Sequence, residues 1–295
     1  MLMVVVFGLF KFHFFWTPDI LFVVLFGLFL ILGQGKQFAI YFSPFLILLL
    51  SFDKLRSLAP IINHRVHYLE MPNFDKWLFG GHLPTAWLQR HLYFGHVAWY
   101  DFGFYFLYML HFIAPIILAV VIWKFKPKYY GQFVSALLVL SYAAFITYVI
   151  FPAAPPWMSS DYGKIDHIQR ISSDVWRTFG VKDFSLYYKK LAPNAVAAVP
   201  SLHAAYPFLF ALTIRKIWGN KWFAISLTYP LLVGFGVVYL GEHYVFDVLL
   251  GFVYATLAFY AAPYVLQFIS AQIGKLNRKY GPTLRRLERQ SHGRS

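Results

Sequence analysis

The stretch VPSLHAAYPFLFALTIRKIW, residues 199–218, contains the features that decide the fold. After a Pro-Ser turn it is apolar for long enough to form a short membrane-crossing helix, which needs roughly 17 to 25 residues. It places a histidine, His203, at the start of this helix and a basic pair, Arg215 and Lys216, at its end. Because a titratable ring is costly in lipid, an intramembrane histidine indicates a functional site.

The composition of the whole chain is that of a membrane protein. Of its 295 residues, 59% are hydrophobic, 21% aromatic and only 13% charged, and the mean hydropathy is +0.57. The net charge of +14 indicates a protein that contacts anionic lipid rather than nucleic acid, because the charges lie between apolar runs and at the C-terminus. No Cys is present, which excludes disulfides and thiolate sites. We expect no cofactor.

Further apolar runs on both sides of this stretch predict more spans. In the second part of the chain, the predicted spans are 102–123, 131–151, 202–218, 222–240 and 248–270. The N-terminal region adds two or three, from the runs 2–16, 19–33 and 38–52, and we interpret it as retained rather than as a cleaved signal peptide. The predicted fold class is an all-α polytopic bundle of about six to eight transmembrane helices with interfacial helices.

The predicted organisation has four parts. Residues 1–52 hold the N-terminal transmembrane segments, and residues 53–100, which mix charges with Trp, Gly and Pro, form an amphipathic region along the membrane interface. Residues 101–273 form the catalytic helical core, with an outer loop at 152–200, and residues 274–295 form a basic tail.

Clusters of Lys and Arg on alternate loops predict the orientation. They are Lys124, Lys126 and Lys128; Arg215, Lys216 and Lys221; and the tail after Gly274. The positive-inside rule makes these loops and the C-terminus cytoplasmic. The loop 152–200 and the turn at Gly241 then face the non-cytoplasmic side, and we predict the plasma membrane as the location.

Two crossings after His203, the chain returns to the same face at VYLGEHYVFDVLLG, residues 238–251. This return places His243 and Asp247 at the depth of His203. Such residues can form a metal site or transfer phosphate through a covalent histidine, and the spacing fits the second role better. Asp247 lies one helical turn beyond His243 and can fix its tautomer, while the second histidine can protonate a leaving oxygen. The helix start at Ser201 suits phosphate.

The motifs PSLH at 200–203 and YLGEHYVFD at 239–247 resemble the second and third signature motifs of the type 2 phosphatidic acid phosphatase superfamily, which includes lipid phosphate phosphatases and vanadium haloperoxidases. The resemblance covers about residues 100–270. It implies that His243 is the nucleophile that forms a phosphohistidine, that Asp247 orients it, and that His203 is the general acid and later the base. Ser201 and the adjacent backbone at Pro200 would then bind phosphate oxygens, with no metal ligand in the set.

Two departures from the superfamily pattern stand out. Gly236 and Val237 replace the usual Ser-Arg before the histidine, and FPAAPPW at 151–157 lacks the Lys and Arg of the first motif. This pattern is similar to the inositol phosphorylceramide synthase branch, as are DKWLFGGHLPTAWLQ (75–89) and WYDFGFYFLYMLHF (99–112). Cations must then come from elsewhere, and the candidates are Arg170, Arg177, Lys182, Lys189, Lys190, Arg90 and His111.

Three more residues are candidates for substrate binding. Trp157 either shapes the site or anchors a helix end at the interface, while Asn194 and Glu242 bind head-group hydroxyls or tune the histidines. The predicted function is transfer of a phosphorylated head group, of the inositol-phosphate type, from a membrane phospholipid to a hydroxyl acceptor. The alternative is a lipid phosphate or pyrophosphate phosphatase that uses water at the same site. A second alternative is a non-catalytic transporter or scaffold.

Overall fold

The computed structural model describes residues 18–180 and 194–292. Across these two ranges the regular structure is helical and no strand forms, which confirms the all-α class. The apolar run 2–16 and the candidates Lys182, Lys189 and Lys190 lie outside the described residues. The longer helices are α2 (Pro18–Ile31), α3 (Gly35–Arg56), α7 (Trp99–Met109), α8 (Ala114–Phe125), α9 (Tyr130–Ile150), α13 (Leu202–Trp218), α15 (Thr228–Tyr239) and α16 (Val245–His292).

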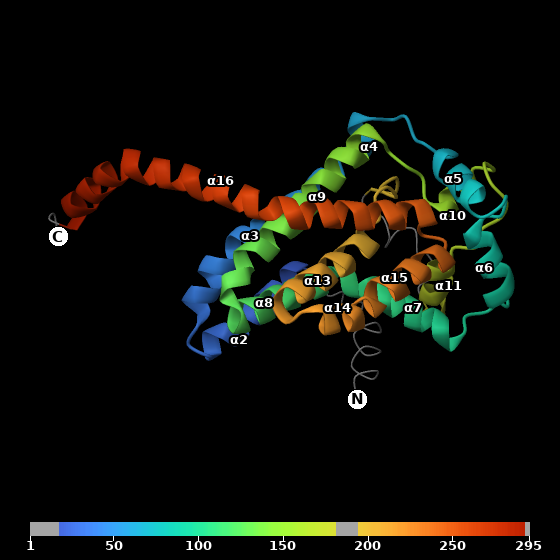
Figure 1. Cartoon of the computed structure of the whole chain (residues 1–295), viewed down its shortest axis with the longest axis horizontal. Coiled ribbons are helices and arrows are strands. Elements are labelled where there is room, and N and C mark those ends of the chain that lie inside the picture. The colour runs from blue at the N-terminus through green and yellow to red at the C-terminus, as the bar shows by residue number, and fades with distance from the viewer. Residues whose placement is uncertain (1–17, 181–193, 293–295) are drawn as a thin grey trace.

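Short helices connect or cover these elements. They are α4 (Ala59–Ile62), α5 (Glu70–Leu78), α6 (Pro84–Leu92), η1 (Leu110–Phe112), η2 (Pro127–Tyr129), α10 (Pro156–Asp161), α11 (Ile171–Thr178) and α14 (Asn220–Ser226). In Figure 1, α5, α6, α10 and α11 gather at the end of the bundle where α16 begins. We call this end the site end. The C-terminal part of α16 projects away from the bundle on the opposite side.

Four helical stretches of the described chain are long and apolar enough to cross a bilayer, namely Gly35–Ile62, Pro127–Ile150, Asn220–Tyr239 and Val245–Gln272. The pair α7 and α8 makes a fifth if it is counted as one bent span. The helix α13, with 17 residues, is at the short end of the range for a span. The chain is therefore a polytopic membrane protein, as its composition predicts.

The predicted span over 102–123 is divided into two helices at a bend. The axes of α7 and α8 differ by 56°, and the short turn η1 separates them. The physical reason is local, because Pro115 lies in the first turn of α8, where a missing N–H costs nothing, whereas inside a continuous helix it would break a hydrogen bond.

The centre of the bundle is formed by α9, α13 and α16, and α16 packs against both of the others. The helix α3 packs between α2 and α9, and α15 packs between α13 and α7. Close contact between α16 and the start of α13 depends on Gly251, because a Cβ atom there would lie 2.6 Å from the carbonyl oxygen of Ser201. A glycine on α16 thus brings the two helix starts of the site together.

At the site end, the segment FPAAPPW is held between two other extended pieces of chain. Ala153 pairs in isolated bridges with His67 on one side and Ala197 on the other. The amide of Ala153 donates to Val196 at 2.9 Å, and the amide of His67 donates to Pro152 at 2.8 Å. The prolines therefore end α9 and leave a short extended segment that ties the loop before α13 to the loop before α5.

Candidate active site

His243 lies in a tight turn between α15 and α16. The carbonyl of Val237 accepts the amides of both Glu242, at 3.0 Å, and His243, at 3.1 Å. The turn requires Gly241, which has a φ of +81° and whose added Cβ would lie 2.8 Å from the carbonyl oxygen of Gln169. The chain therefore reverses within a few residues and projects the histidine from the end of α15.

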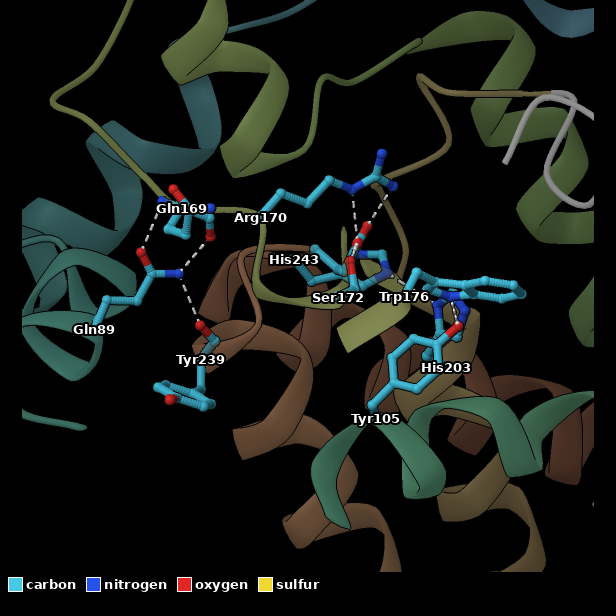
Figure 2. Close-up of polar contacts among 10 residues, drawn as sticks. Gln89, Tyr105, Gln169, Arg170, Ser172, Trp176, His203, Tyr239 and His243 are labelled. Carbon is cyan, nitrogen blue, oxygen red and sulfur yellow. Dashed lines mark hydrogen bonds and ion pairs between the residues drawn. The ribbon is translucent and has the colours of Figure 1, made fainter. Parts of the chain in front are cut away.

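The side chain of Gln89 fixes this turn to the outer loop. Its Nε2 donates to the carbonyls of Gln169 at 2.8 Å and Tyr239 at 2.9 Å, and its Oε1 accepts the amide of Gln169 at 2.9 Å. Figure 2 shows the three hydrogen bonds as a bracket beside the histidine pair. Because Gln89 is buried, these bonds are shielded from water.

The three residues Asp247, His243 and His203 form a hydrogen-bonded line. His243 Nδ1 lies 3.2 Å from Asp247 Oδ2. His243 Nε2 lies 3.0 Å from His203 Nδ1, a contact that Figure 2 shows. Asp247 is fully buried and His243 is 5% exposed. A carboxylate can only accept, so His243 donates from Nδ1 and its Nε2 carries a lone pair. His243 thus sits in the middle, with Nδ1 held by Asp247 and Nε2 accepting a hydrogen bond from His203.

These groups do not surround a common point. Among the described residues, no set of three or more His, Cys, Asp and Glu side chains is arranged to hold a metal ion. The arrangement instead matches an orienting acid, a central imidazole and a second imidazole, which is the pattern of an activated nucleophile.

Aromatic rings hold His203 in place at the start of α13. Its ring stacks on Tyr108, with centroids 4.3 Å apart and planes 16° apart, and meets His111 edge-on at 4.0 Å. The Nδ1 atom of His111 lies 2.8 Å from the carbonyl of Tyr108. His111, a candidate cation from the sequence, is placed beside His203 as a buried packing partner.

Ser201 connects the two helix starts. Its amide donates to the carbonyl of Asp247 at 3.0 Å, while its side-chain hydroxyl is buried and has no hydrogen-bond partner in the described chain. The neighbouring Pro200 carbonyl accepts the Tyr148 hydroxyl at 3.1 Å. A buried hydroxyl without a partner is costly, and this one lies at the N-terminus of a helix that begins beside the histidines, where phosphate oxygens are well stabilised.

Glu242 belongs to a buried ion pair next to His243. Arg170 donates from Nε and Nη2 to the two carboxylate oxygens at 2.9 and 3.1 Å, and Ser172 donates to the same carboxylate (Figure 2). Burial opposes ionisation of Glu242, but Arg170 and Ser172 outweigh it and lower the pKa of this carboxyl. The Arg170 guanidinium also lies 4.0 Å from the centre of the Trp157 ring. Both carboxylate oxygens of Glu242 thus already accept hydrogen bonds from Arg170 and Ser172.

The remaining candidates from the sequence lie in other settings. Asn194 donates to the backbone carbonyl of Arg56 at 2.9 Å and accepts the amide of Val196 at 3.0 Å, so it fixes the loop before α13. Arg177 is largely exposed and pairs with Asp174 at 2.9 Å, and Arg90 is exposed on α6. These contacts do not join the three residues to the histidine pair.

Two residues of the site end were not among the candidates from the sequence, although Asp75 begins the stretch 75–89 that is similar to the synthase branch. Arg56, in the last turn of α3, lies close enough to His203, His111 and Tyr148 to act on them electrostatically. Asp75, on α5, bonds to the start of α16. Both are separated from His243 by more than a hundred residues, and each looks in the sequence like an ordinary interfacial charge.

The structure is a polytopic helical membrane protein with a His–His–Asp line in which His243 and Asp247 are buried. Comparison with known proteins identifies its family. Residues 70–261 match the PAP2 superfamily, and the chain belongs to this superfamily. It is 32% identical to the phosphoinositol dihydroceramide synthase of Bacteroides thetaiotaomicron over 234 residues, which are 73% of each protein.

Two more distant similarities accompany this relative. The chain is 28% identical to inositolphosphotransferase 1 of Saccharomyces cerevisiae over 187 residues, which are 59% of this chain and 30% of the yeast protein. The chain thus spans less than a third of that relative. The crystal structure of Aquifex aeolicus LpxE aligns with a TM-score of 0.46 at 15% identity, and covers 60% of this chain and 93% of that chain.

Proposed function

We propose that the protein is a membrane lipid phosphotransferase that moves a phosphoinositol-type head group from a phospholipid donor to a lipid hydroxyl acceptor, through a phosphohistidine at His243. The observation that carries this proposal is the hydrogen-bonded line from Asp247 through His243 to His203. The names of the two relatives support the head group, and the name of the bacterial relative supports a ceramide-type acceptor.

The first step makes the phosphohistidine. The His243 Nε2 lone pair attacks the donor phosphorus, a P–N bond forms, and the P–O bond to the leaving lipid alcohol breaks. His203 enters as an imidazolium and gives its proton to the leaving oxygen. Asp247 keeps the Nδ1 proton of His243 in place and stabilises the charge that develops on the ring. The 3.0 Å hydrogen bond between the histidines must open to admit the phosphorus.

The second step transfers the head group. The now neutral His203 takes the proton of the acceptor hydroxyl, whose oxygen attacks phosphorus as the P–N bond breaks. This step restores the His203 imidazolium and the free Nε2 of His243. Water in place of the acceptor gives hydrolysis by the same residues, so the choice between transferase and phosphatase depends on what reaches His203 in this step.

Arg56, Ser201 and the first amides of α13 provide the binding site for phosphate oxygens in this proposal. The Arg56 guanidinium acts on His203 through space, and the Ser201 hydroxyl is buried without a partner in the described chain. Arg170 makes two hydrogen bonds to Glu242. A phosphodiester carries one charge fewer than a monoester dianion, which fits a site with fewer cations than the superfamily pattern.

The orientation follows from the same proposal. The site end faces the non-cytoplasmic side of the plasma membrane, and the basic loops and the C-terminus face the cytoplasm. The region 53–100 lies along the interface, where its exposed tryptophans Trp77, Trp87 and Trp99, at 75%, 51% and 83% exposure, contact lipid head groups.

Because the chain has no Cys, single-cysteine variants test this orientation cleanly. Asp161→Cys on α10 marks the site end and Lys221→Cys on α14 marks the other end, and both positions are exposed. A membrane-impermeant maleimide should label the first variant in intact cells and the second only after permeabilisation. The reverse pattern would refute the orientation.

The function is tested with purified protein in liposomes that contain a radiolabelled phosphoinositol phospholipid, with and without ceramide. A new phosphoinositol sphingolipid that forms only with ceramide, and not with the His243→Asn variant, is the expected result. Release of free phosphate or phosphoinositol alone would establish the phosphatase alternative. Products that are equal for wild type and His243→Asn would remove His243 from the mechanism, and the absence of any product from either protein would favour a non-catalytic role.

A further inference from the structure

Asp75 caps a helix to which it does not belong. It lies on α5 and is fully buried. Its Oδ2 accepts the amide of Val245 and its Oδ1 accepts the amide of Phe246, both at 2.9 Å. These are the first two residues of α16, whose leading amides have no partner within their own helix. A carboxylate 170 residues upstream therefore fills the place that an N-cap side chain normally takes.

The burial of this carboxylate is costly, so the interaction must be specific. Burial raises the pKa of Asp75 to about 6, with a further contribution from the charge of Asp247, while the two amide bonds favour the ionised form. At pH 7 the group is still an anion and can accept both amides. Anionic acceptors make stronger hydrogen bonds than neutral ones, and a negative charge at a helix start is stabilised by the helix dipole.

The same helical turn contains Asp247. Its Oδ2 accepts both the amide of Tyr244, at 2.9 Å, and Nδ1 of His243. The position of the Asp247 carboxylate therefore depends on where the first turn of α16 is held. Phe246 adds an apolar contact between α5 and the first turn of α16, since its ring lies against that of Phe74 with centroids 4.9 Å apart.

We infer that Asp75 is a positioning residue for phosphoryl transfer, which holds the first turn of α16 so that Asp247 can orient His243. This inference rests on the proposed function. Asp75 touches neither the reacting atoms nor the histidines, and acts only through the backbone of Val245 and Phe246. Displacement of a catalytic group by about 1 Å can lower the rate about 100-fold, so a small shift of this turn has a measurable effect on turnover.

The test is Asp75→Asn, which keeps the side-chain shape but turns one acceptor into a donor that faces an amide. We expect kcat to fall about 10- to 100-fold, with KM changed less than about threefold, because substrate contacts are untouched. Hydrogen exchange in the peptide that contains Val245 and Phe246 should accelerate. The matched control is Asp101→Asn, which alters another fully buried carboxylate that accepts an amide, from Ala98, and the Tyr239 hydroxyl.

A second variant distinguishes the loss of the bond between Asp75 and the amides of α16 from a general loss of stability. Val245→Pro removes one of the two donors, and proline suits the first position of a helix. The loss of kcat caused by Asp75→Asn should be at least about threefold smaller in the Val245→Pro background, since the donor–donor clash is gone. Equal losses in both backgrounds would contradict the direct pairing.

The positioning role is overturned if Asp75→Asn lowers only the melting temperature, or if Asp101→Asn lowers kcat as much. Failure of the proposed function is a different result, because activity would then survive His243→Asn. The two ideas are thus tested independently in one set of liposome assays.

Discussion

The two ends of the helical bundle differ in whether their charged side chains are buried or exposed. At the site end, the ionisable groups Asp75, Asp247 and Glu242 are buried. Asp75 and Glu242 bond to groups from distant parts of the chain, and Asp247 bonds to His243 one helical turn away. At the opposite end, Lys124 and Lys216 are exposed and bond to the surface amides of Gln34 and Gln132. Buried charge is expensive unless it is paired, so the buried charges at the site end depend on specific partners, while the exposed charges of the other end do not.

The pairing at the site end also joins segments that the sequence separates. Gln89 holds the turn at Gly241 from one side, and Asp75 holds the start of α16 from the other. His243 lies between these two clamps. At the opposite end, the bonds that Lys124 and Lys216 make are exposed. The comparison predicts that substitutions at the site end have large effects on activity and stability, and that those at the basic end have small ones.

The largest effect is expected for His243→Asn, which removes the nucleophile. Transfer activity in liposomes should fall by about 10⁴-fold or more, as for the loss of nucleophiles in other covalent enzymes, without a change in melting temperature beyond a few degrees. The control is His91→Asn, because His91 is exposed and bonds only to Trp87 of its own helix among the contacts described. A similar loss in the control would mean that the assay reports folding rather than chemistry.

The next largest effect is on stability, at the buried ion pair. Glu242→Gln leaves Arg170 without its charge partner, which costs about 3–5 kcal/mol for a buried pair. Because the pKa of Glu242 is lowered in the fold, the pair stabilises the protein above the ordinary glutamate range, and this contribution is lost as the pH falls through the lowered pKa. Thermal unfolding in detergent should show a gap between wild type and variant at pH 7 that closes in acid. A constant gap from pH 7 to pH 3 would contradict the charge explanation.

Arg56→Met should weaken catalysis without unfolding the protein. If Arg56 binds the transferred phosphate, kcat/KM should fall about 100-fold, the usual cost of one donor to a developing anion. Arg177→Met is the matched control, since this side chain is largely exposed and pairs with Asp174. Equal activity of the two variants would contradict the proposal that Arg56 binds the transferred phosphate.

The smallest effect is expected at the basic end. Lys216→Met removes an exposed bond to Gln132, and such surface interactions contribute at most about 1 kcal/mol. The rate of transfer should be unchanged, and the melting temperature should shift by only a degree or two. A large loss of activity would show that the two ends are coupled and that the contrast between them is too simple.

Much of the fold could be predicted from the chain alone. Apolar runs of the right length predicted the all-α membrane bundle, and the alternation of basic loops placed His203, His243 and Asp247 at one depth, where the structure brings them into contact. Their catalytic roles stay predictions. The bend between α7 and α8 was missed, because hydropathy does not report helix continuity and the only signal was Pro115.

The surroundings of the histidines were harder to predict. Glu242 was a candidate for head-group binding, but its carboxylate is engaged by Arg170 and Ser172. Asn194 was also a candidate, and its amide holds the backbone of Arg56. Both residues adjoin a signature motif in sequence, yet adjacency along the chain does not say which way a side chain points or which distant group meets it.

The sequence by itself determined that this is a membrane protein, that it is helical and which residues make up the His–His–Asp set. Hydropathy, span length and local spacing are properties of short segments. Only the tertiary structure decided which charges are buried and which groups satisfy them. The partners of α16, of the Gly241 turn and of Glu242 come from residues 75, 89 and 170. Such long-range contacts depend on how helices pack, and local sequence does not contain that information.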